Sequence, residues 1–265
     1  LEGVMHFAAY KSVGESVEFP IMYYQNNINS LLALVEVMKE HQVNNLIFSS
    51  SCTVYGEPDS IPVDEYAPFK KAESPYGATK QMCEQILEDA VRADIDLKVI
   101  SLRYFNPIGA HPSAMLGELP IDKPNNLVPY ITQTAGSIRE KLVVFGGDYD
   151  TPDGTCIRDF IHIVDLAQAH VKAIDKLLGE GISDGYQYYN LGTGQGISVL
   201  QLVKEFIEVT GVTLNYEIGP RRAGDVVKTY ANPAKAHAQL GWSSQYTTKD
   251  ALRDAWAWEK KISNH

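Results

Sequence analysis

Three features are scarce in this sequence, and each scarcity excludes a class of protein. Only three cysteines occur in 265 residues, an odd number without metal-ligand spacing: Cys52, Cys83 and Cys156. We therefore expect a cytoplasmic protein with no disulfide framework and no metal site. No apolar run reaches the roughly 20 residues of a membrane span, so no membrane is expected as a partner. The net charge of −10 argues against nucleic acid as a partner.

A glycine-rich dinucleotide fingerprint is missing from the start of the chain, where such folds carry it after their first strand. The one candidate, "YYNLGTGQGISV", lies late in the chain and has Ile197 where a third glycine is expected. We interpret it as a tight strand-to-helix turn. Because the chain starts at Leu1 and not at methionine, we expect the first βαβ unit to lie upstream, and the 265 residues alone to be inactive and to hold no cofactor.

Strands and helices alternate along the first part of the chain. Apolar runs predict strands at 3–9, 44–51 and 97–105, and the 3.6-residue period predicts helices at 20–42 and 74–92 between them. This order is typical of an α/β fold with a mostly parallel, doubly wound sheet.

The pattern loosens after Pro107, with a Pro- and Gly-rich loop over 107–125. The remaining elements predicted from the sequence are a helix at 127–140, a strand at 142–146, a strand running into a helix at 157–178, a strand at 186–192, and helices at 198–210 and 247–262.

A tyrosine and a lysine share one face at the start of the helix in "SPYGATKQM". Tyr76 and Lys80 are four residues apart, and i, i+4 side chains are neighbours on a helix. A second Tyr-x-x-x-Lys, Tyr66 to Lys70, contains Pro68 and is not expected to be helical. Spacing alone leaves a surface pair and a catalytic pair equally open.

Ser51 ends the strand before this helix, at the edge of the sheet where ligands bind. A phenol with a pKa near 10 needs help to act as a base at neutral pH, and a nearby ammonium group favours the phenolate. Ser51, Tyr76 and Lys80 could therefore form a catalytic set, with the serine holding a substrate hydroxyl while the tyrosine takes its proton.

These three residues resemble the catalytic set of the short-chain dehydrogenase/reductase superfamily. The chain as a whole resembles the UDP-glucose 4-epimerases of its extended branch, through "HFAAYKSVGES", "FSSSCTVYGEP", "SPYGATK", "LRYFNPIGAHP", "PNNLVPYI", "DGTCIRDFIHIVDLA", "YNLGTGQG" and "RRAGDV". The resemblance implies a partial Rossmann-like sheet, the remainder of an NAD-binding domain, over 1–107. It implies a smaller C-terminal α/β domain for a UDP-sugar over 108–265, with segments at about 160–190 returning to the first domain.

The resemblance also implies roles for individual residues. NAD as cofactor would be held by Ala8, Ala9, Lys11, Asn26, Ser49, Tyr76, Lys80 and Tyr104. The UDP-sugar substrate would be held by Ser51, Thr53, Tyr76, Phe105, Asn106, Asn126, Leu127, Val143, Phe145, Arg158, Arg222, Asp225 and Thr229. The arginines would clamp the pyrophosphate, which suits planar bidentate donors.

The two residues that directly follow Ser51 indicate which reaction the chain would catalyse. Related dehydratases carry an Asp-Glu pair there and related decarboxylases carry a glutamate, whereas this chain has Cys52 and Thr53. Without those carboxyl groups elimination and decarboxylation lack their usual acid or base. The resemblance therefore implies interconversion of UDP-glucose and UDP-galactose by oxidation and re-reduction at C4, in a homodimer paired through helices 21–41 and 75–92. The N-acetylated sugars are a further expected substrate pair.

Several alternatives stay open from the residues alone. The chain could be another nucleotide-sugar enzyme of the extended branch, a redox-sensing binding module or an inactive fragment. Arg158 could pair with its neighbour Asp159, and "NNL" could be a helix cap. His162 and Asp165 are better read as helix-start and core groups than as metal ligands, and Cys52 as a small buried residue rather than a nucleophile.

Overall fold

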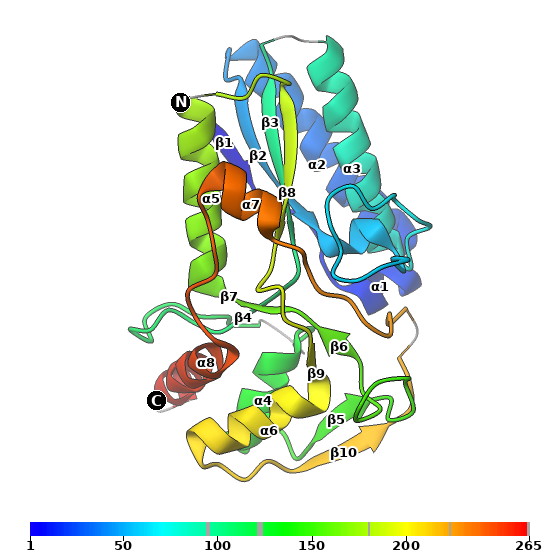
Figure 1. Cartoon of the computed structure of the whole chain (residues 1–265), viewed down its shortest axis with the longest axis vertical. Helices are drawn as coiled ribbons and strands as arrows, with labels where there is room; N and C mark the ends of the chain where they lie inside the picture. The colour runs from blue at the N-terminus through cyan, green and yellow to red at the C-terminus, as the bar shows by residue number, and fades with distance from the viewer. Residues whose placement is uncertain (94–95, 121–123, 180, 223, 264–265) are drawn as a thin grey trace. The chain divides into compact units, whose positions relative to one another are not determined.

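The computed structural model describes residues 1–93, 96–120, 124–179, 181–222 and 224–263 (Figure 1). The chain divides into two compact units. The first consists of Leu1–Phe105, Gln168–Leu191 and Ala231–Ser243, and the second of Asn106–Ala167, Gly192–Tyr230 and Ser244–His265.

A four-stranded parallel sheet forms the centre of the first unit. Its strands are β1 (Val4–His6), β2 (Asn45–Ser51), β3 (Lys98–Tyr104) and β8 (Tyr186–Leu191), in the order β1-β2-β3-β8. Every neighbouring pair is parallel, so the predicted α/β fold with a parallel, Rossmann-like sheet is confirmed. The residues of β2 and β3 are buried almost throughout, as expected for a sheet covered on both faces.

Helices cover the two faces of this sheet. The helices α2 (Pro20–Glu40) and α3 (Pro75–Ala93) pack together on one side, and α5 (Ile163–Leu178) lies on the other (Figure 1). The unit also contains α1 (Val13–Glu18), the short 3₁₀ helix η1 (Cys52–Tyr55) and α7 (Ala234–Leu240). One core cluster under α2 and α3 includes the fully buried Leu31, Leu46, Phe48, Leu87 and Val99.

The second unit combines three helices with short strand pairs. Its helices are α4 (Leu127–Ala135), α6 (Val199–Thr210) and α8 (Thr248–Ser263). Its strand pairs are parallel β5 (Leu142–Phe145) with β10 (Tyr216–Gly219), parallel β4 (Asn106–Ile108) with β7 (Phe160–His162), and antiparallel β6 (Ile157–Arg158) with β9 (Ile197–Ser198). The core of this unit includes Ile131, Val144, Leu202, Phe206 and Leu252.

Some elements differ from the sequence prediction. The helix expected over 127–140 ends at Ala135, because Gly136 follows and Ser137 takes a left-handed conformation with φ of 60°. The short α1, α7 and β10 were not predicted. No described helix combines the length and the apolar character that crossing a membrane requires.

Candidate active site

The structure brings Ser51, Tyr76 and Lys80 together at the carboxyl end of β2. The hydroxyl of Ser74 accepts a hydrogen bond of 3.2 Å from the Gly77 amide and so caps the start of α3. One turn of this helix separates Tyr76 from Lys80; both are buried, and the ammonium nitrogen lies 5.9 Å from the centre of the phenol ring. Ser51 is the last residue of β2 and forms a hydrogen bond with the Tyr76 phenol.

The electrostatics of this group depend mainly on burial. Burial raises the pKa of the Tyr76 phenol, and the hydrogen bond with Ser51 opposes that rise. Burial lowers the pKa of Lys80 to about 8. The ammonium group donates one hydrogen bond to the described residues, 2.6 Å to the carbonyl oxygen of Ser49. Two of its three N–H groups therefore remain available to a ligand such as a ribose diol.

The loop after β1 is held in place by an asparagine of α2. The Asn27 amide donates to the Tyr10 carbonyl (3.0 Å) and to the Thr79 hydroxyl (3.1 Å), and it accepts from the Tyr10 amide (2.8 Å). The sequence prediction assigned the role of fixing this loop to Asn26. The Asn26 side chain instead donates a hydrogen bond of 3.0 Å to the Asn27 side chain. Three predicted cofactor residues of this loop are exposed or half-buried: Ala8, Ala9 and Lys11.

The other predicted residues of the first unit lie at the ends of β2 and β3. Ser49 is buried in β2, and Tyr104 lies opposite Ser51 in the β2–β3 register. The Thr53 hydroxyl oxygen is buried and has no hydrogen-bond partner among the described residues, which makes it available to a ligand. The Phe105 side chain is buried in a core cluster with Val54 and Val63.

A compact charged cluster forms in the second unit. Arg222 donates to both oxygens of Asp225, at 3.2 and 2.7 Å, and lies 5.9 Å from the ring of Phe145. Arg158 approaches the same carboxylate at 3.6 Å and is largely buried. Two guanidinium groups and one carboxylate leave a net charge of +1, which suits an anion. Val143 shares the outward face of β5 with Phe145, because strand residues two apart point the same way.

Three further predicted residues of this unit lie on other segments. The Asn106 side-chain oxygen is buried and lacks a hydrogen-bond partner among the described residues. Asn126 occupies the position before α4, but its side chain donates to Glu118 (2.7 Å) and makes no cap hydrogen bond; Leu127, which follows, packs against the core. Thr229 is buried, and its amide donates to the Ile157 carbonyl at 3.1 Å, next to Arg158 in the chain.

The late glycine motif holds a carboxylate of the protein itself. The amides of Thr193 and Gly194 donate to Asp159 at 2.8 and 3.1 Å, and the Thr193 hydroxyl does so at 2.7 Å. This supports the interpretation of the motif as a structural turn, and it shows that Asp159 serves this turn while Arg158 pairs with Asp225.

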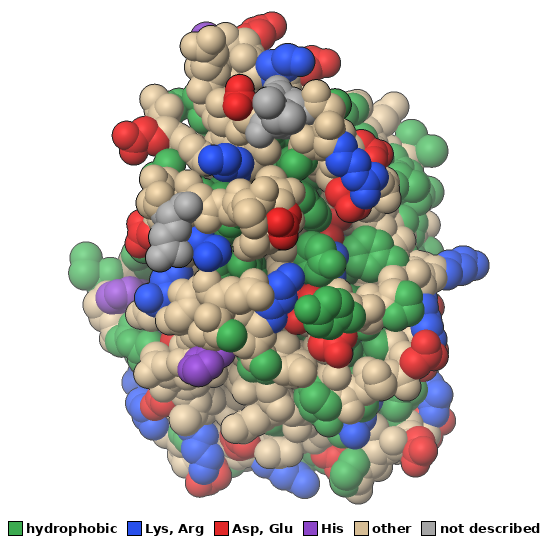
Figure 2. All heavy atoms as spheres, turned by 45° about the horizontal axis from the view of Figure 1, so that its top comes forward, with side chains coloured by type: hydrophobic (Ala, Val, Ile, Leu, Met, Phe, Trp, Pro, Cys, Tyr) green, Lys and Arg blue, Asp and Glu red, His purple; other side chains and the backbone are tan. Residues whose placement is uncertain are grey.

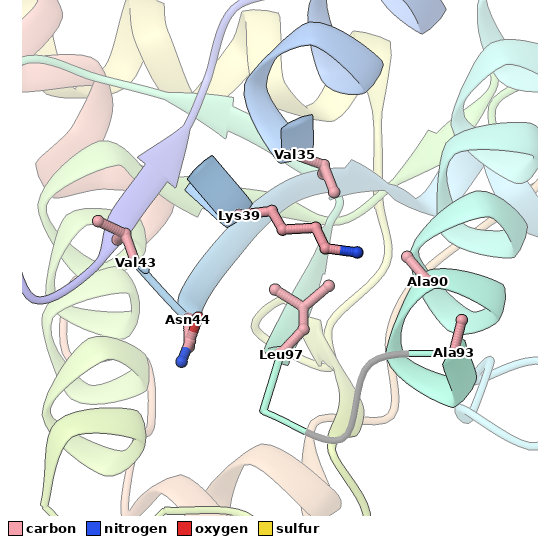
Figure 3. Close-up of a pocket in the computed structure, with 7 residues that line it drawn as sticks. All are labelled: Val35, Lys39, Val43, Asn44, Ala90, Ala93 and Leu97. Atoms are coloured by element: carbon pink, nitrogen blue, oxygen red, sulfur yellow. The ribbon is translucent and has the colours of Figure 1, made fainter. Parts of the chain in front are cut away.

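The histidine motif and the cavity lie outside both groups of site residues. His162 accepts a hydrogen bond of 3.0 Å from the Val164 amide at the start of α5, and no metal-binding cluster occurs within the described ranges. A cavity of about 160 Å³ lies near the C-terminal ends of α2 and α3. Its lining contains no predicted site residue and comprises the residues labelled in Figure 3: Val35, Lys39, Val43, Asn44, Ala90, Ala93 and Leu97.

Three buried polar residues around the catalytic group were not predicted. Asn27 lies on the buried stripe of α2 between Tyr23 and Leu31, and Glu84 lies one turn beyond Lys80 on α3. Arg103 lies among the buried residues of strand β3. The available signal was a polar residue at a core-facing position, which is rarely tolerated without a partner.

Comparison with known proteins shows the family to which the chain belongs. Residues 1–192 match the model of the NAD dependent epimerase/dehydratase family. The UDP-glucose 4-epimerase of Yersinia enterocolitica is 50% identical over 264 residues, which cover 100% of this chain and 77% of that protein.

Solved structures of relatives superpose closely. The Bifidobacterium longum UDP-glucose 4-epimerase in complex with NAD⁺ and UDP matches with a TM-score of 0.95 and 46% identity, covering 100% of this chain and 78% of the other. The Stenotrophomonas maltophila UDP-glucose-4-epimerase with bound NAD and formylated UDP-arabinopyranose matches with a TM-score of 0.95 and 45% identity, covering 100% and 77%. The chain belongs to the NAD-dependent epimerase/dehydratase family.

Proposed function

We propose that this protein is a cytoplasmic isomerase of galactose metabolism, which interconverts UDP-glucose and UDP-galactose by NAD-mediated oxidation and re-reduction at C4 of the hexose. The observation that carries the proposal is the arrangement of Ser51, Tyr76 and Lys80 at one sheet edge, without a carboxylate at Cys52 or Thr53. The relatives described above bear the same activity in their names, and two of them hold NAD together with UDP or a UDP-sugar.

The three catalytic residues of the first unit have distinct roles in the reaction. Ser51 holds the C4 hydroxyl by a hydrogen bond, Tyr76 takes its proton, and the Lys80 ammonium group favours the phenolate. NAD, held beside Lys80 and Tyr104, would supply a reversible hydride acceptor for C4, so the cofactor would not be consumed. The same phenol returns the proton to the oxygen at the end of the cycle.

The residues present fit this cofactor. Lys80 keeps two N–H groups for the hydroxyls of a ribose, and Tyr104 lies beside the end of β2. Ala8 and Ala9 leave the backbone of the loop open, because their side chains are too small to cover it. The Asn27 side chain donates hydrogen bonds both to Tyr10 in this loop and to Thr79 on α3. It therefore links the loop to the helix that carries Tyr76 and Lys80.

The second unit supplies the groups for the nucleotide. The cluster of Arg158, Arg222 and Asp225 has a net charge of +1 and suits a pyrophosphate, and the outward ring of Phe145 offers a surface for the uracil. The Asn106 side-chain oxygen, which has no hydrogen-bond partner in the described part of the chain, is a further acceptor for the sugar-nucleotide.

Replacing Arg222 by alanine is expected to weaken UDP binding by about 10- to 100-fold, the usual worth of one or two hydrogen bonds to a charged group. Isothermal titration of the chain with UDP measures this. The control is Arg221→Ala, because this neighbouring arginine pairs with Asp148 at the surface. Equal UDP affinities of the two variants would contradict the assigned cluster. A redox sensor of the same fold would respond to NAD and ignore UDP.

Turnover itself is tested in a longer form of the protein, here called the extended form, in which a βαβ unit with a G-x-x-G-x-x-G fingerprint is fused ahead of Leu1. We expect the extended form to convert UDP-glucose into UDP-galactose, and the 265 residues alone to retain no NAD and to be inactive, because the pyrophosphate of a dinucleotide sits on the helix that follows such a fingerprint. Product is measured by chromatography. An extended form that retains NAD but produces no UDP-galactose would overturn the proposed function.

A homodimer paired through α2 and α3 is part of the proposal. Large apolar side chains are exposed on α2, with Ile21 at 65%, Leu32 at 41% and Val37 at 50%, and Met82 is exposed at 44% on α3. Figure 2 shows exposed apolar side chains on the face it presents, among interspersed acidic and basic ones. Two copies of these helices can cover each other as an isologous four-helix contact.

The charge substitution Leu32→Glu is expected to convert the dimer into a monomer, because a carboxylate in an apolar contact is costly to bury. Sedimentation equilibrium measures the mass. The matched control is Val171→Glu, which places the same charge at an exposed valine on α5. A wild-type monomer, or an unchanged dimer in Leu32→Glu, would contradict the assigned contact.

A further inference from the structure

A buried ion pair lies behind the catalytic residues of the first unit. Glu84 on α3 and Arg103 on β3 are 3% and 4% exposed. The guanidinium group binds both carboxylate oxygens, with nitrogen–oxygen distances of 2.6, 2.9 and 3.1 Å. This two-point geometry fixes the orientation of the carboxylate as well as its charge.

Arg103 is itself fixed from several elements. Its second terminal nitrogen donates to the Tyr55 hydroxyl at 3.0 Å, and that hydroxyl donates to Asn190 at 2.7 Å. The central guanidinium carbon lies 4.1 Å from the ring centre of Tyr188 and 4.8 Å from that of Phe69. β8 and the segment between η1 and α3 therefore hold the arginine in one position.

Glu84 connects this pair to the catalytic strand end. Its carboxylate accepts a hydrogen bond from the Ser50 hydroxyl. Ser50 lies between Ser49, whose carbonyl accepts the Lys80 ammonium group, and Ser51, which bonds to the Tyr76 phenol. The hydrogen bond from Ser50 to Glu84 therefore fixes the residue between Ser49 and Ser51, the two residues that contact Lys80 and Tyr76.

Glu84 also lies on the same helix face as the catalytic side chains. Tyr76, Lys80 and Glu84 follow one another at intervals of four residues on α3, and all three are buried. The titratable groups that face Lys80 are Tyr76, Cys83 and Glu84 on α3 and His6 on β1. Burial lowers the pKa of Lys80, and Cys83 and then Glu84 oppose that lowering. Glu84 is the one carboxylate among these groups, and it is also paired with the Arg103 cation.

A purely structural role is a weak explanation for this arrangement. A buried ion pair can commonly be replaced by apolar side chains of similar volume with little loss of stability. Apolar side chains in the same place could not accept the Ser50 hydroxyl or place a negative charge one turn from Lys80.

We propose that Glu84, oriented by Arg103, is a positioning residue of the reaction: it fixes the Ser49–Ser51 strand end through Ser50 and places a negative charge one helical turn from Lys80. The proposal rests on the proposed function for its effect on turnover. It assigns to Glu84 no contact with the substrate.

The test compares three variants of the extended form: Glu84→Gln, Ser50→Ala, and a double variant that carries both Glu84→Leu and Arg103→Met. We expect Glu84→Gln to lower kcat by about 10- to 100-fold, since small misplacements of catalytic groups have effects of this size. KM for UDP-glucose and UDP affinity stay within about 2-fold, because the arginine cluster is unchanged. Ser50→Ala also lowers kcat, and the double variant, which removes the charges together and keeps the apolar packing, folds but stays impaired.

The charge effect has its own measurement. In Glu84→Gln the alkaline limb of the kcat–pH profile moves to lower pH, because Lys80 loses a charge that favours its protonated form. Ser50→Ala, which changes no charge, leaves the position of that limb unaltered. The pKa of Lys80, followed by NMR of ¹³C-labelled lysine side chains, falls in Glu84→Gln with or without turnover.

The matched control is Glu259→Gln. Glu259 is a buried glutamate of α8 that accepts hydrogen bonds from Thr132 and Ser263 in the second unit. The Glu259→Gln variant should be less stable than the wild type and should keep the wild-type kcat–pH profile. Wild-type kcat in Glu84→Gln and Ser50→Ala, or an unchanged Lys80 pKa in Glu84→Gln, would overturn the proposal. An inactive wild-type extended form would instead count against the proposed function, and the Lys80 titration would still decide the role of Glu84.

Discussion

Replacing Tyr76 by phenylalanine in the extended form should lower kcat for epimerisation by about 10² to 10⁴, the usual contribution of a positioned general base. The change removes one oxygen and keeps the buried ring, so the packing of α3 against β2 should persist. UDP affinity should change little, because the arginine cluster lies on other segments. Steady-state kinetics and isothermal titration with UDP measure the two quantities.

The chain provides a matched control for this variant. Tyr66 begins the second Tyr-x-x-x-Lys of the sequence, but its side chain is 85% exposed and its segment is not helical. Tyr66→Phe should leave kcat unchanged. A Tyr76→Phe enzyme with wild-type turnover would remove the phenol from the mechanism.

The substitution Thr229→Tyr should change sugar choice, the second large effect we expect. Thr229 is buried and follows the Ile157–Lys228 bridge, beside Arg158, and no strand begins at this residue. We propose that this small side chain leaves room for an N-acetyl group at the 2-position of the sugar, so that the wild-type extended form accepts UDP-N-acetylglucosamine as well as UDP-glucose. A phenol ring and an acetamide cannot share one packed space.

The ratio of kcat/KM for the two sugars measures this effect. Thr229→Tyr should lower kcat/KM for UDP-N-acetylglucosamine by about 100-fold relative to UDP-glucose, corresponding to nearly 3 kcal/mol. Thr229→Ser, which stays small, should keep the wild-type ratio. An equal ratio in wild type and Thr229→Tyr would show that Thr229 does not gate the sugar.

The parts of the first unit that depend on local pattern could be predicted from the sequence. The apolar runs of β2 and β3 and the 3.6-residue period of α2 and α3 are local signals, and they were confirmed with small shifts in their ends. The neighbouring position of Tyr76 and Lys80 follows from helix geometry alone. Ser51 could be added because parallel strands end at a common edge.

The buried polar contacts could not be predicted in the same way. Glu84 and Arg103 are 19 residues apart and meet only because α3 packs on β3, and the Tyr55–Asn190 hydrogen bond spans 135 residues. Asn26 and Asn27 are adjacent in sequence, and only the fold decides which of them faces the loop. A polar residue at a core-facing position indicates that a partner exists, but which residue is the partner depends on long-range packing.

The most direct test of the central claim is the fate of the hydrogen at C4. The extended form is incubated with UDP-[4-²H]glucose, and the UDP-galactose produced is analysed by mass spectrometry and NMR. The deuterium should be retained at C4 of the product, because the same hydride leaves and returns, and reaction of unlabelled substrate in D₂O should introduce none. Loss of the label to solvent, or turnover without UDP-galactose, would contradict the account.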